Sequence, residues 1–270
     1  MSDMLVLYHG SCMDGFCAAW VVHKVYPDAK FQAVSYQEPP PDVSGRNVII
    51  VDFSYKRDVM EEMKKNAQSL RVFDHHKTAW EELSSLPYCI FDMNRSGARL
   101  AWDLLVCSPW ATKNPDIPDM VRYIEDRDLW KFELPHSKEI NAALSSYPRD
   151  FAVWDGLEKR DIKELILEGT AILRYQTQLV DFLAGEAEEI DMAGQKVLSI
   201  NSPVLQSELG NRLAQGRPFG VVWHDQRGKR KFSLRSDAKG VDVSEVAKQY
   251  NGGGHRSASG FSITIGKMLL

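Results

Sequence analysis

The sequence predicts an α/β protein of two domains, with a mainly parallel sheet flanked by helices in the first and a smaller α/β unit in the second. Short β-branched runs alternate with helical patterns in the first half of the chain. A long amphipathic pattern follows, after which shorter strand and helix patterns resume. The length of 270 residues also exceeds that of most single domains. We expect domains at 1–160 and 189–270, joined by a linker helix at 161–188.

Five apolar runs in the first half are predicted to be strands. The run at 47–54 is the most strongly β-branched and is the best candidate for a central strand. The other four runs lie at 5–8, 31–34, 70–74 and 88–92. Small apolar or amphipathic segments predict helices at 16–22, 55–67, 96–105 and 118–130.

Histidine and aspartate gather where three of these strands end. The carboxyl ends of parallel strands meet at one edge of a sheet, where open α/β sheets bind their ligands. Three such ends rich in these two residue types therefore indicate a metal site. The plain alternative is that the acids support helix N-termini and the histidines are incidental. The residues concerned are His9, Asp14, Asp52, Asp74, His75 and His76.

Two helices of this half carry further candidates. Ser96 and Gly97 begin a helix whose N-terminus either suits an anion or is simply capped. The helix at 118–130 ends in an acidic cluster that includes Asp126 and Asp128. That cluster either belongs to the site or is a solvated, charged helix end.

The second half resumes with four shorter strands and two helices. The strands are expected at 196–200, 219–223, 231–235 and 261–265, with helices at 204–214 and 242–250.

A run of three glycines lies near the end of this second unit. Gly252, Gly253 and Gly254 allow the backbone to approach a ligand and to offer N–H groups to phosphate. A flexible hairpin loop is the alternative. Because His255 and Arg256 follow directly, we favour an anion pocket.

Composition limits the classes of partner. A net charge of −4 and a pI near 6.0 argue against a protein that coats a long nucleic acid through a positive field. The four cysteines form no CxxC pair and are too sparse for a disulfide framework. The chain enters an apolar strand without a basic leader, and no apolar run is long enough to span a bilayer. We expect a reduced, cytoplasmic, soluble protein.

In their order along the chain, these segments resemble the DHH superfamily of phosphoesterases, in the branch with a C-terminal DHHA1 domain that includes the oligoribonuclease-like nanoRNases. Each motif is short, and the resemblance depends on their order and spacing over nearly the whole chain. The matching segments are His-Gly-Ser-Cys-Met-Asp-Gly at 9–15, Val51-Asp52, Asp74-His75-His76, the Asp126/Asp128 cluster, Leu234-Arg235-Ser236 and Gly252-Gly253-Gly254-His255.

The resemblance implies a site for two divalent ions, Mn²⁺ or otherwise Mg²⁺ or another divalent metal, at the mouth of the first domain. Asp52 would bridge the ions, and His9 would bind one of them. The second ion would be held by Asp14, His75 and an acid of the 118–130 helix, for which we favour Asp126 over Asp128.

One residue departs from the family pattern. The first motif usually contains Asp-x-Asp, whereas this chain has Cys12-Met13-Asp14. Thiolate is a softer ligand that suits Zn²⁺ or Fe²⁺ better than Mn²⁺. Cys12 is therefore a candidate ligand, and because of it the sequence does not decide which metal ion is bound.

The resemblance also assigns roles outside the ligand set. Asp74 would orient the histidines or act as a ligand, and His76 would face the substrate phosphate. Candidate substrate-binding residues are Ser96, Arg99, Arg235, Ser236, Gly252, Gly253, Gly254, His255 and Arg256.

The function expected from the resemblance is metal-dependent hydrolysis of short oligonucleotides, nanoRNA or linear dinucleotides, to mononucleotides by a two-metal-activated water. An acidic chain favours a short substrate over a long nucleic-acid track. Alternatives are a phosphatase acting on 3′-phosphoadenosine 5′-phosphate, pyrophosphate or polyphosphate, and a non-catalytic nucleotide-binding module. No membrane partner is expected, and the oligomeric state stays open between monomer and homodimer.

Overall fold

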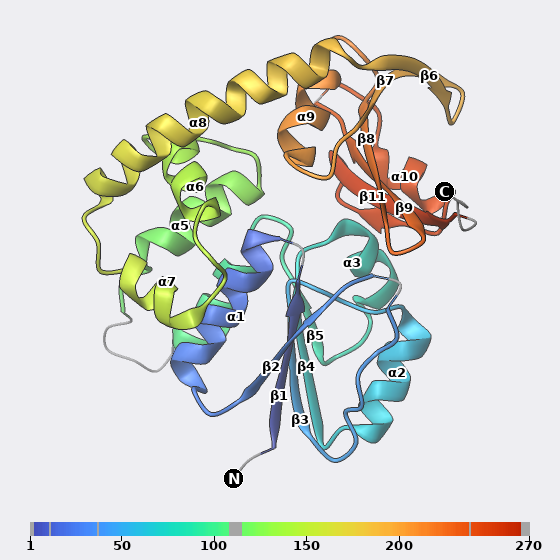
Figure 1. Ribbon diagram of the computed structural model, residues 1–270. Helices are drawn as coiled ribbons and strands as arrows, with labels where there is room; N and C mark the ends of the chain where they lie inside the picture. Colours follow the sequence, from blue (N-terminus) through green and yellow to red (C-terminus); the bar gives the residue numbers. More distant parts are fainter. Residues whose placement is uncertain (1–2, 11, 37, 108–114, 238, 266–270) are drawn as a thin grey trace. The chain divides into compact units, whose positions relative to one another are not determined.

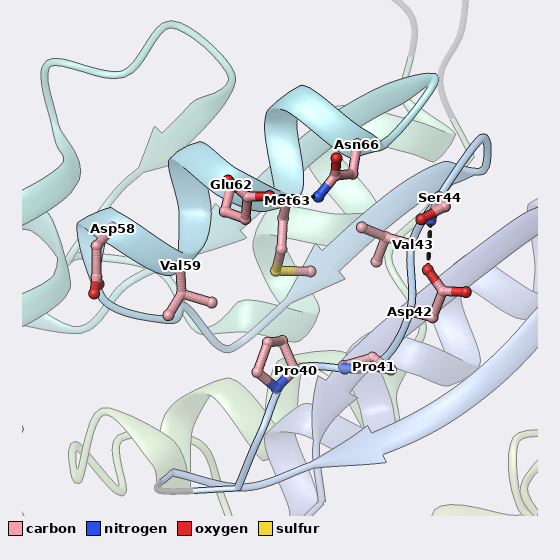
Figure 2. Close-up of a pocket in the computed structure, with 10 residues that line it drawn as sticks. All are labelled: Pro40, Pro41, Asp42, Val43, Ser44, Asp58, Val59, Glu62, Met63 and Asn66. Carbon is pink, nitrogen blue, oxygen red and sulfur yellow. Dashed lines mark hydrogen bonds between the residues drawn. The ribbon is translucent and has the colours of Figure 1, made fainter.

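The computed structural model describes residues 3–10, 12–36, 38–107, 115–237 and 239–265 (Figure 1). Ser11 of the first motif lies outside the described residues. The chain divides into two compact units, Met1–Leu173 and Arg174–Leu270, each with its own sheet. The division falls inside a long helix, α8 (Ile162–Gly185), whose extent agrees with the linker helix expected from the sequence. The domain limits stay a prediction.

The first unit is built on a five-stranded parallel sheet of order β2-β1-β3-β4-β5. As expected from its β-branched sequence, β3 is central. The strands are β1 (Met4–His9), β2 (Lys30–Val34), β3 (Asn47–Val51), β4 (Ser69–Asp74) and β5 (Cys89–Phe91).

Helices cover both faces of this sheet (Figure 1). On one face, Val6, Ile49 and Phe73 pack with α1 (Met13–Val25), α4 (Gly97–Ala101) and α5 (Asp119–Asp128). On the other face, Leu7 and Ile50 pack with α2 (Arg57–Asn66) and α3 (Lys77–Leu83). Because neighbouring strand residues point to opposite faces, a sheet covered on both sides has strands that are apolar throughout.

Four helical segments differ from the sequence prediction. The helix expected at 96–105 continues from α4 as a π-helical turn, Trp102–Val106. The short helices α3, α6 (Ser137–Ser145) and α7 (Phe151–Leu157) were not predicted. Helices α6 and α7 pack against the core on the α1 side, through Ala143 and Trp154.

The second unit contains a six-stranded sheet of order β10-β11-β9-β8-β7-β6, in which only β7 and β8 are parallel among the described pairs. It has its own apolar core, which includes Phe219 and Leu234. The strand β6 was not predicted. The elements are β6 (Glu188–Met192), β7 (Gln195–Asn201), α9 (Gln206–Leu213), β8 (Gly220–Gln226), β9 (Lys229–Arg235), α10 (Val243–Lys248), β10 (Gly253–Gly254) and β11 (Ala258–Thr264). Within the described residues, no helix has both the length and the apolar character needed to cross a bilayer.

Candidate active site

The strand ends bring the predicted ligands together at one edge of the parallel sheet. His9 is the last residue of β1, Asp52 directly follows β3, and Asp74 ends β4. Since β1, β3 and β4 are neighbours that run in the same direction, their carboxyl ends meet. The first helix adds Asp14 from its first turn.

Asp52 lies at the centre of this group. Its backbone is left-handed, with φ of 53°, a conformation that aspartate tolerates better than most residues. Its Oδ1 lies 3.0 Å from Nε2 of His75, and its Oδ2 accepts the Cys12 thiol at 2.9 Å. Burial acts to raise the pKa of Asp52, but hydrogen bonds to His75 and His9 outweigh burial and hold it well below its ordinary value.

Asp52 belongs to three groups of potential ligands among the described residues. One of them also contains His9 and Cys12, the second contains Asp14 and His75, and the third contains Asp74 and His76. Within each group the ligand atoms lie within 4.8 Å of one another. Oxygen, imidazole and sulfur donors gathered in this way are chemically suited to a divalent cation.

Buried negative charge gives a second reason why the site fits cations. Burial and the nearby carboxylates of Asp128 and Asp52 raise the pKa of Asp14 well above its ordinary value. The pKa of the Cys12 thiol is also raised well above its ordinary value, by burial and by Asp52. Burial would lower the pKa of His75, but its hydrogen bond to Asp52 and the charge of Asp128 raise it to about 10. A protonated imidazole thus partly balances these acids, and a divalent ion would balance them more fully.

Asp14 occupies the N-terminus of α4. Its Oδ2 accepts the N–H of Gly97 at 2.6 Å, and its Oδ1 accepts that of Ala98 at 3.1 Å. A Cβ on Gly97 would lie 2.5 Å from the Cβ of Asp52, so only glycine allows this approach. The anion expected at this helix N-terminus is therefore a carboxylate of the protein itself.

The structure gives Ser96 and Arg99 structural partners rather than an open binding surface. The Ser96 hydroxyl is buried and accepts the N–H of Arg99 at 3.3 Å, as an N-cap does. The Arg99 side chain donates to Asp103 at 2.9 Å and pairs with Glu125 at 3.4 Å. The expectation that Ser96 and Arg99 contact the substrate stays a prediction. Their hydrogen bonds within the protein do not support it.

The two acids of α5 have different surroundings. The carboxylate of Asp126 accepts the backbone N–H groups of Glu133 at 2.9 Å and Leu134 at 3.3 Å, so it holds the segment that follows the helix. Asp128 instead lies with Oδ2 3.5 Å from Nε2 of His75. This geometry favours Asp128 over Asp126 as the candidate ligand, and the choice between them stays a prediction.

Asp74 and His76 form a pair beside the ligand groups. Oδ1 of Asp74 lies 2.7 Å from Nδ1 of His76 and accepts the His75 N–H at 2.7 Å, and its Oδ2 accepts the Ser54 hydroxyl at 2.5 Å. Burial acts to raise the pKa of Asp74, but the histidines and Ser54 lower it to about 2. Burial would lower the pKa of His76, yet the Asp74 carboxylate raises it. Asp74 thus bonds the His76 ring and the His75 backbone, and its expected role in orienting the histidines stays a prediction.

Sequence reasoning missed two residues at this site. Ser54 was treated only as the end of a strand, although its hydroxyl bonds Asp74. The ring of Tyr36 lies 5.5 Å from that of His9 and 6.3 Å from that of His76, and its residue remains 49% exposed. A lone tyrosine after a short strand carries no signal in one sequence that could have identified it.

In the second unit, the arginines of the predicted anion pocket bond to their own fold. Arg235 donates to the Ser207 hydroxyl at 2.8 Å, and Arg256 donates to the Gly240 carbonyl at 2.9 Å. The backbone N–H of Ser236 donates to Ser257 at 3.0 Å, and the carbonyl of His255 accepts the Ser259 hydroxyl at 2.6 Å.

The glycine run is used for strand packing. Gly252 donates its N–H to Ala247, and a Cβ there would lie 2.2 Å from the Gly260 oxygen. Gly253 and Gly254 pair with β11, and Gly254 has a φ of 139°. Close packing of two strands thus accounts for these glycines without a ligand, and their role in phosphate binding stays a prediction.

Comparison with known proteins agrees with this geometry. Residues 201–268 match the DHHA1 domain family. The uncharacterized protein R106 of Acanthamoeba polyphaga mimivirus is 32% identical over 291 residues, which cover 96% of this chain and 67% of that protein. Oligoribonuclease NrnB of Bacillus subtilis is 42% identical over 224 residues, which cover 72% of this chain and 53% of NrnB. The chain thus spans about half the length of NrnB.

A third relative and one solved structure complete the comparison. The bifunctional oligoribonuclease and PAP phosphatase NrnA of Mycoplasma pneumoniae is 24% identical over 229 residues, covering 78% of this chain and 66% of NrnA. The pGpG-specific phosphodiesterase PggH of Vibrio cholerae has the same fold, with a TM-score of 0.50 at 17% identity over 97% of this chain and 93% of that one. The chain belongs to the DHH superfamily of phosphoesterases, in the branch that carries a C-terminal DHHA1 domain.

Proposed function

We propose that this chain is a divalent-metal-dependent phosphodiesterase that hydrolyses short oligonucleotides to mononucleotides. The observation that carries the proposal is the position of Asp52, which is common to a fully buried group of ligands with Asp14 and His75 and to a partly buried one with His9 and Cys12. The named activities of NrnB and NrnA as oligoribonucleases support the substrate class. Four free cysteines suit a reducing compartment, and we propose the cytoplasm.

The residues divide the work between holding cations and handling the substrate. His9, Cys12 and Asp52 would hold one ion, and Asp14, Asp52, His75 and Asp128 the other. Two such ions, when bound, lower the pKa of a water and neutralise charge on the phosphate oxygens. We propose Mn²⁺ or Mg²⁺ for the oxygen-rich side, while the Cys12 thiol makes the His9 side suitable for a softer ion.

His76 is the group proposed to act on the substrate. Asp74 fixes its Nδ1 and raises its pKa, so the ring can keep a proton on its other nitrogen. A protonated Nε2 can donate a hydrogen bond to a phosphate oxygen or supply the proton that the leaving oxygen needs. Ser54 and the backbone N–H of His75 keep the Asp74 carboxylate ionised, which maintains this orientation.

The test is turnover of 5′-phosphorylated RNAs of two to five nucleotides with Mn²⁺, measured as mononucleotide release. Asp52→Asn removes the shared negative charge but keeps a residue that tolerates the left-handed backbone. We expect a loss in kcat of about 10³-fold or more, on the scale seen when one group that stabilises transition-state charge is removed. Asp42→Asn, which changes an exposed aspartate of the same unit, is the matched control and should retain activity.

Two results would contradict the proposal. One is turnover that persists in excess chelator, and the other is near-normal activity of Asp52→Asn. The name of NrnA includes a PAP phosphatase activity, so 3′-phosphoadenosine 5′-phosphate should be assayed in parallel. Turnover confined to that compound would assign a phosphatase in place of the oligonucleotide hydrolase.

A further inference from the structure

The segment after α5 has an unusual backbone. Trp130, Phe132 and His136 all have left-handed backbones, with φ of 55°, 53° and 57°. For bulky side chains this conformation costs free energy, and such residues persist only where the surrounding structure enforces them. Strained residues of this kind cluster at functional sites, which makes the segment a candidate for a role of its own.

Asp126 enforces this backbone. Its carbonyl accepts the N–H groups of Lys131 at 2.8 Å and Phe132 at 3.3 Å. Its carboxylate accepts the next two N–H groups, those of Glu133 and Leu134. One buried aspartate thus receives four consecutive N–H groups, which explains why it is not oriented toward the ligand groups.

The enforced segment carries an exposed aromatic side chain two residues after the candidate ligand Asp128. Trp130 is 39% exposed, and its ring packs edge-on against that of Phe132 at 4.9 Å. The ammonium of Lys138 lies 5.2 Å from the centre of the Phe132 ring. Trp130 follows two residues after Asp128, so their Cα atoms are at most roughly 7.6 Å apart. The residue that carries this exposed indole thus lies close in the chain to a candidate ligand.

We propose that Trp130, supported by Phe132, is the surface on which a nucleobase of the substrate stacks. This inference rests on the proposed function. An indole offers a flat face to any base, so stacking there gives affinity with little sequence preference. Lys131 and Lys138 are exposed on the same stretch and can attract the phosphate that accompanies that base. Tyr123, whose hydroxyl donates to the Pro135 carbonyl at 3.1 Å, further fixes the segment.

The first test compares the dinucleotide pApA with two analogues that each lack one base. In the wild type, removing the stacked base should raise KM roughly 5- to 150-fold, the range for one base on an aromatic side chain. The Trp130→Ala variant should have a KM for pApA that is higher by a similar factor. Its KM values for pApA and for the analogue without the stacked base should be equal. Trp130→Phe should restore much of the difference. Phe182→Ala, which removes another exposed aromatic ring, is the control and should behave as wild type.

The second test does not depend on turnover. A dinucleotide containing 2-aminopurine loses fluorescence when its base stacks, so binding with Mg²⁺ should quench it in the wild type and much less in Trp130→Ala. If the wild type cleaves pApA and Trp130→Ala still discriminates against the analogues, the inference is overturned while the proposed function stands. The inference is also overturned if Trp130→Ala lowers kcat/KM equally for pApA and both analogues, because such a result indicates a structural role for Trp130. Trp130-dependent quenching without cleavage supports stacking and contradicts the proposed function.

Discussion

Two buried carboxylates, those of Asp14 and Asp52, and the half-buried carboxylate of Asp128 surround one imidazole at the candidate site. Nε2 of His75 lies 3.0 Å from Asp52, 3.5 Å from Asp128 and 3.8 Å from Asp14. Carboxylates gathered around one imidazole repel one another, which disfavours their ionisation at a site shielded from water. Burial, with a further contribution from Asp52, raises the pKa of Asp128 despite the attraction of His75. The metal-free protein thus carries an electrostatic cost at the residues that would bind cations.

The first prediction concerns this cost. Because the folded-state pKa of Asp128 is raised, its ionisation destabilises the fold above the unfolded pKa of about 3.9 and has no effect well below it. Asp128→Asn in chelator at pH 7 should therefore be more stable than the wild type by about 1 kcal/mol, while its metal-dependent activity falls. Urea unfolding at pH 7 and pH 3 measures the difference, which should shrink at the lower pH. A variant less stable than the wild type at pH 7 would contradict this account.

At the residue scale, the sequence indicated which residue types would be ligands and at which strand ends they lie. It did not decide which of two nearby acids on one helix is the better ligand. Asp126 and Asp128 are two positions apart on one helix, and their roles depend on which backbone N–H groups fold back onto α5. The course of the backbone after α5 depends on residues 129–134, two of which have left-handed backbones. The periodicity of a helix does not reveal such positions. The hydroxyl of Ser54 and the ring of Tyr36 depend in the same way on tertiary contacts.

At the scale of elements, α1 is held to α7 by a polar contact at the edge of the core. The buried indole of Trp20 donates to Asp155 at 2.8 Å, and Lys24 lies 2.7 Å from the same carboxylate. Burial acts to raise the pKa of Asp155, but the bonds from Lys24 and Trp20 outweigh it and lower the pKa. Since α1 carries Asp14, this contact helps to position one group of ligands.

A pH-dependent stability follows from this contact. A lowered carboxyl pKa contributes stability above the unfolded pKa of about 3.9, and this contribution is lost as pH falls through the folded value. Asp155→Asn should be less stable than the wild type by about 0.5 kcal/mol at pH 7, because solvent screens this partly exposed carboxylate, and the difference should vanish near or below pH 3. Urea unfolding at pH 7, 5 and 3 tests this, and a difference independent of pH would exclude the ionised contact as its cause.

The elements themselves were predicted unevenly, for physical reasons. Strands β1, β3 and β4 are apolar on both faces and were found directly, because a covered parallel sheet requires such runs. The short helix α7 begins after Pro148 and spans only Phe151–Leu157, so it has too few turns to show a period. Strand β6 (Glu188–Met192) is polar and lies at a sheet edge, where little burial shapes its sequence.

At the scale of the whole molecule, the chain has two units with separate apolar cores. The clusters around Ile50 and Trp20 belong to the first unit, and those around Phe219 and Leu209 to the second. Helix α8 contributes Leu165 to a core of the first unit and Val180 to one of the second. All three groups of ligands that contain Asp52 lie in the first unit. Cation binding should therefore stabilise one unit directly.

Hydrogen exchange can measure how far cation binding stabilises each of the two units. At a metal concentration 100 times the dissociation constant, binding stabilises the state that binds by about 2.7 kcal/mol. Adding Mn²⁺ to chelator-treated protein should slow exchange in β1, β3 and β4, with a smaller effect on the strands of residues 188–264. Asp52→Asn should lose most of the response, and Asp42→Asn should keep it. Equal slowing in both units would contradict direct stabilisation of the first unit alone.

The left-handed backbone of Asp52 also limits how its position can change during evolution. Among side chains with a Cβ, aspartate and asparagine adopt this conformation at least cost. Most other single substitutions would therefore disturb the end of the central strand as well as remove a ligand. Of the two residues that this backbone favours, only aspartate keeps the negative charge that the proposed chemistry needs. Selection for folding and selection for chemistry thus act together on this one residue.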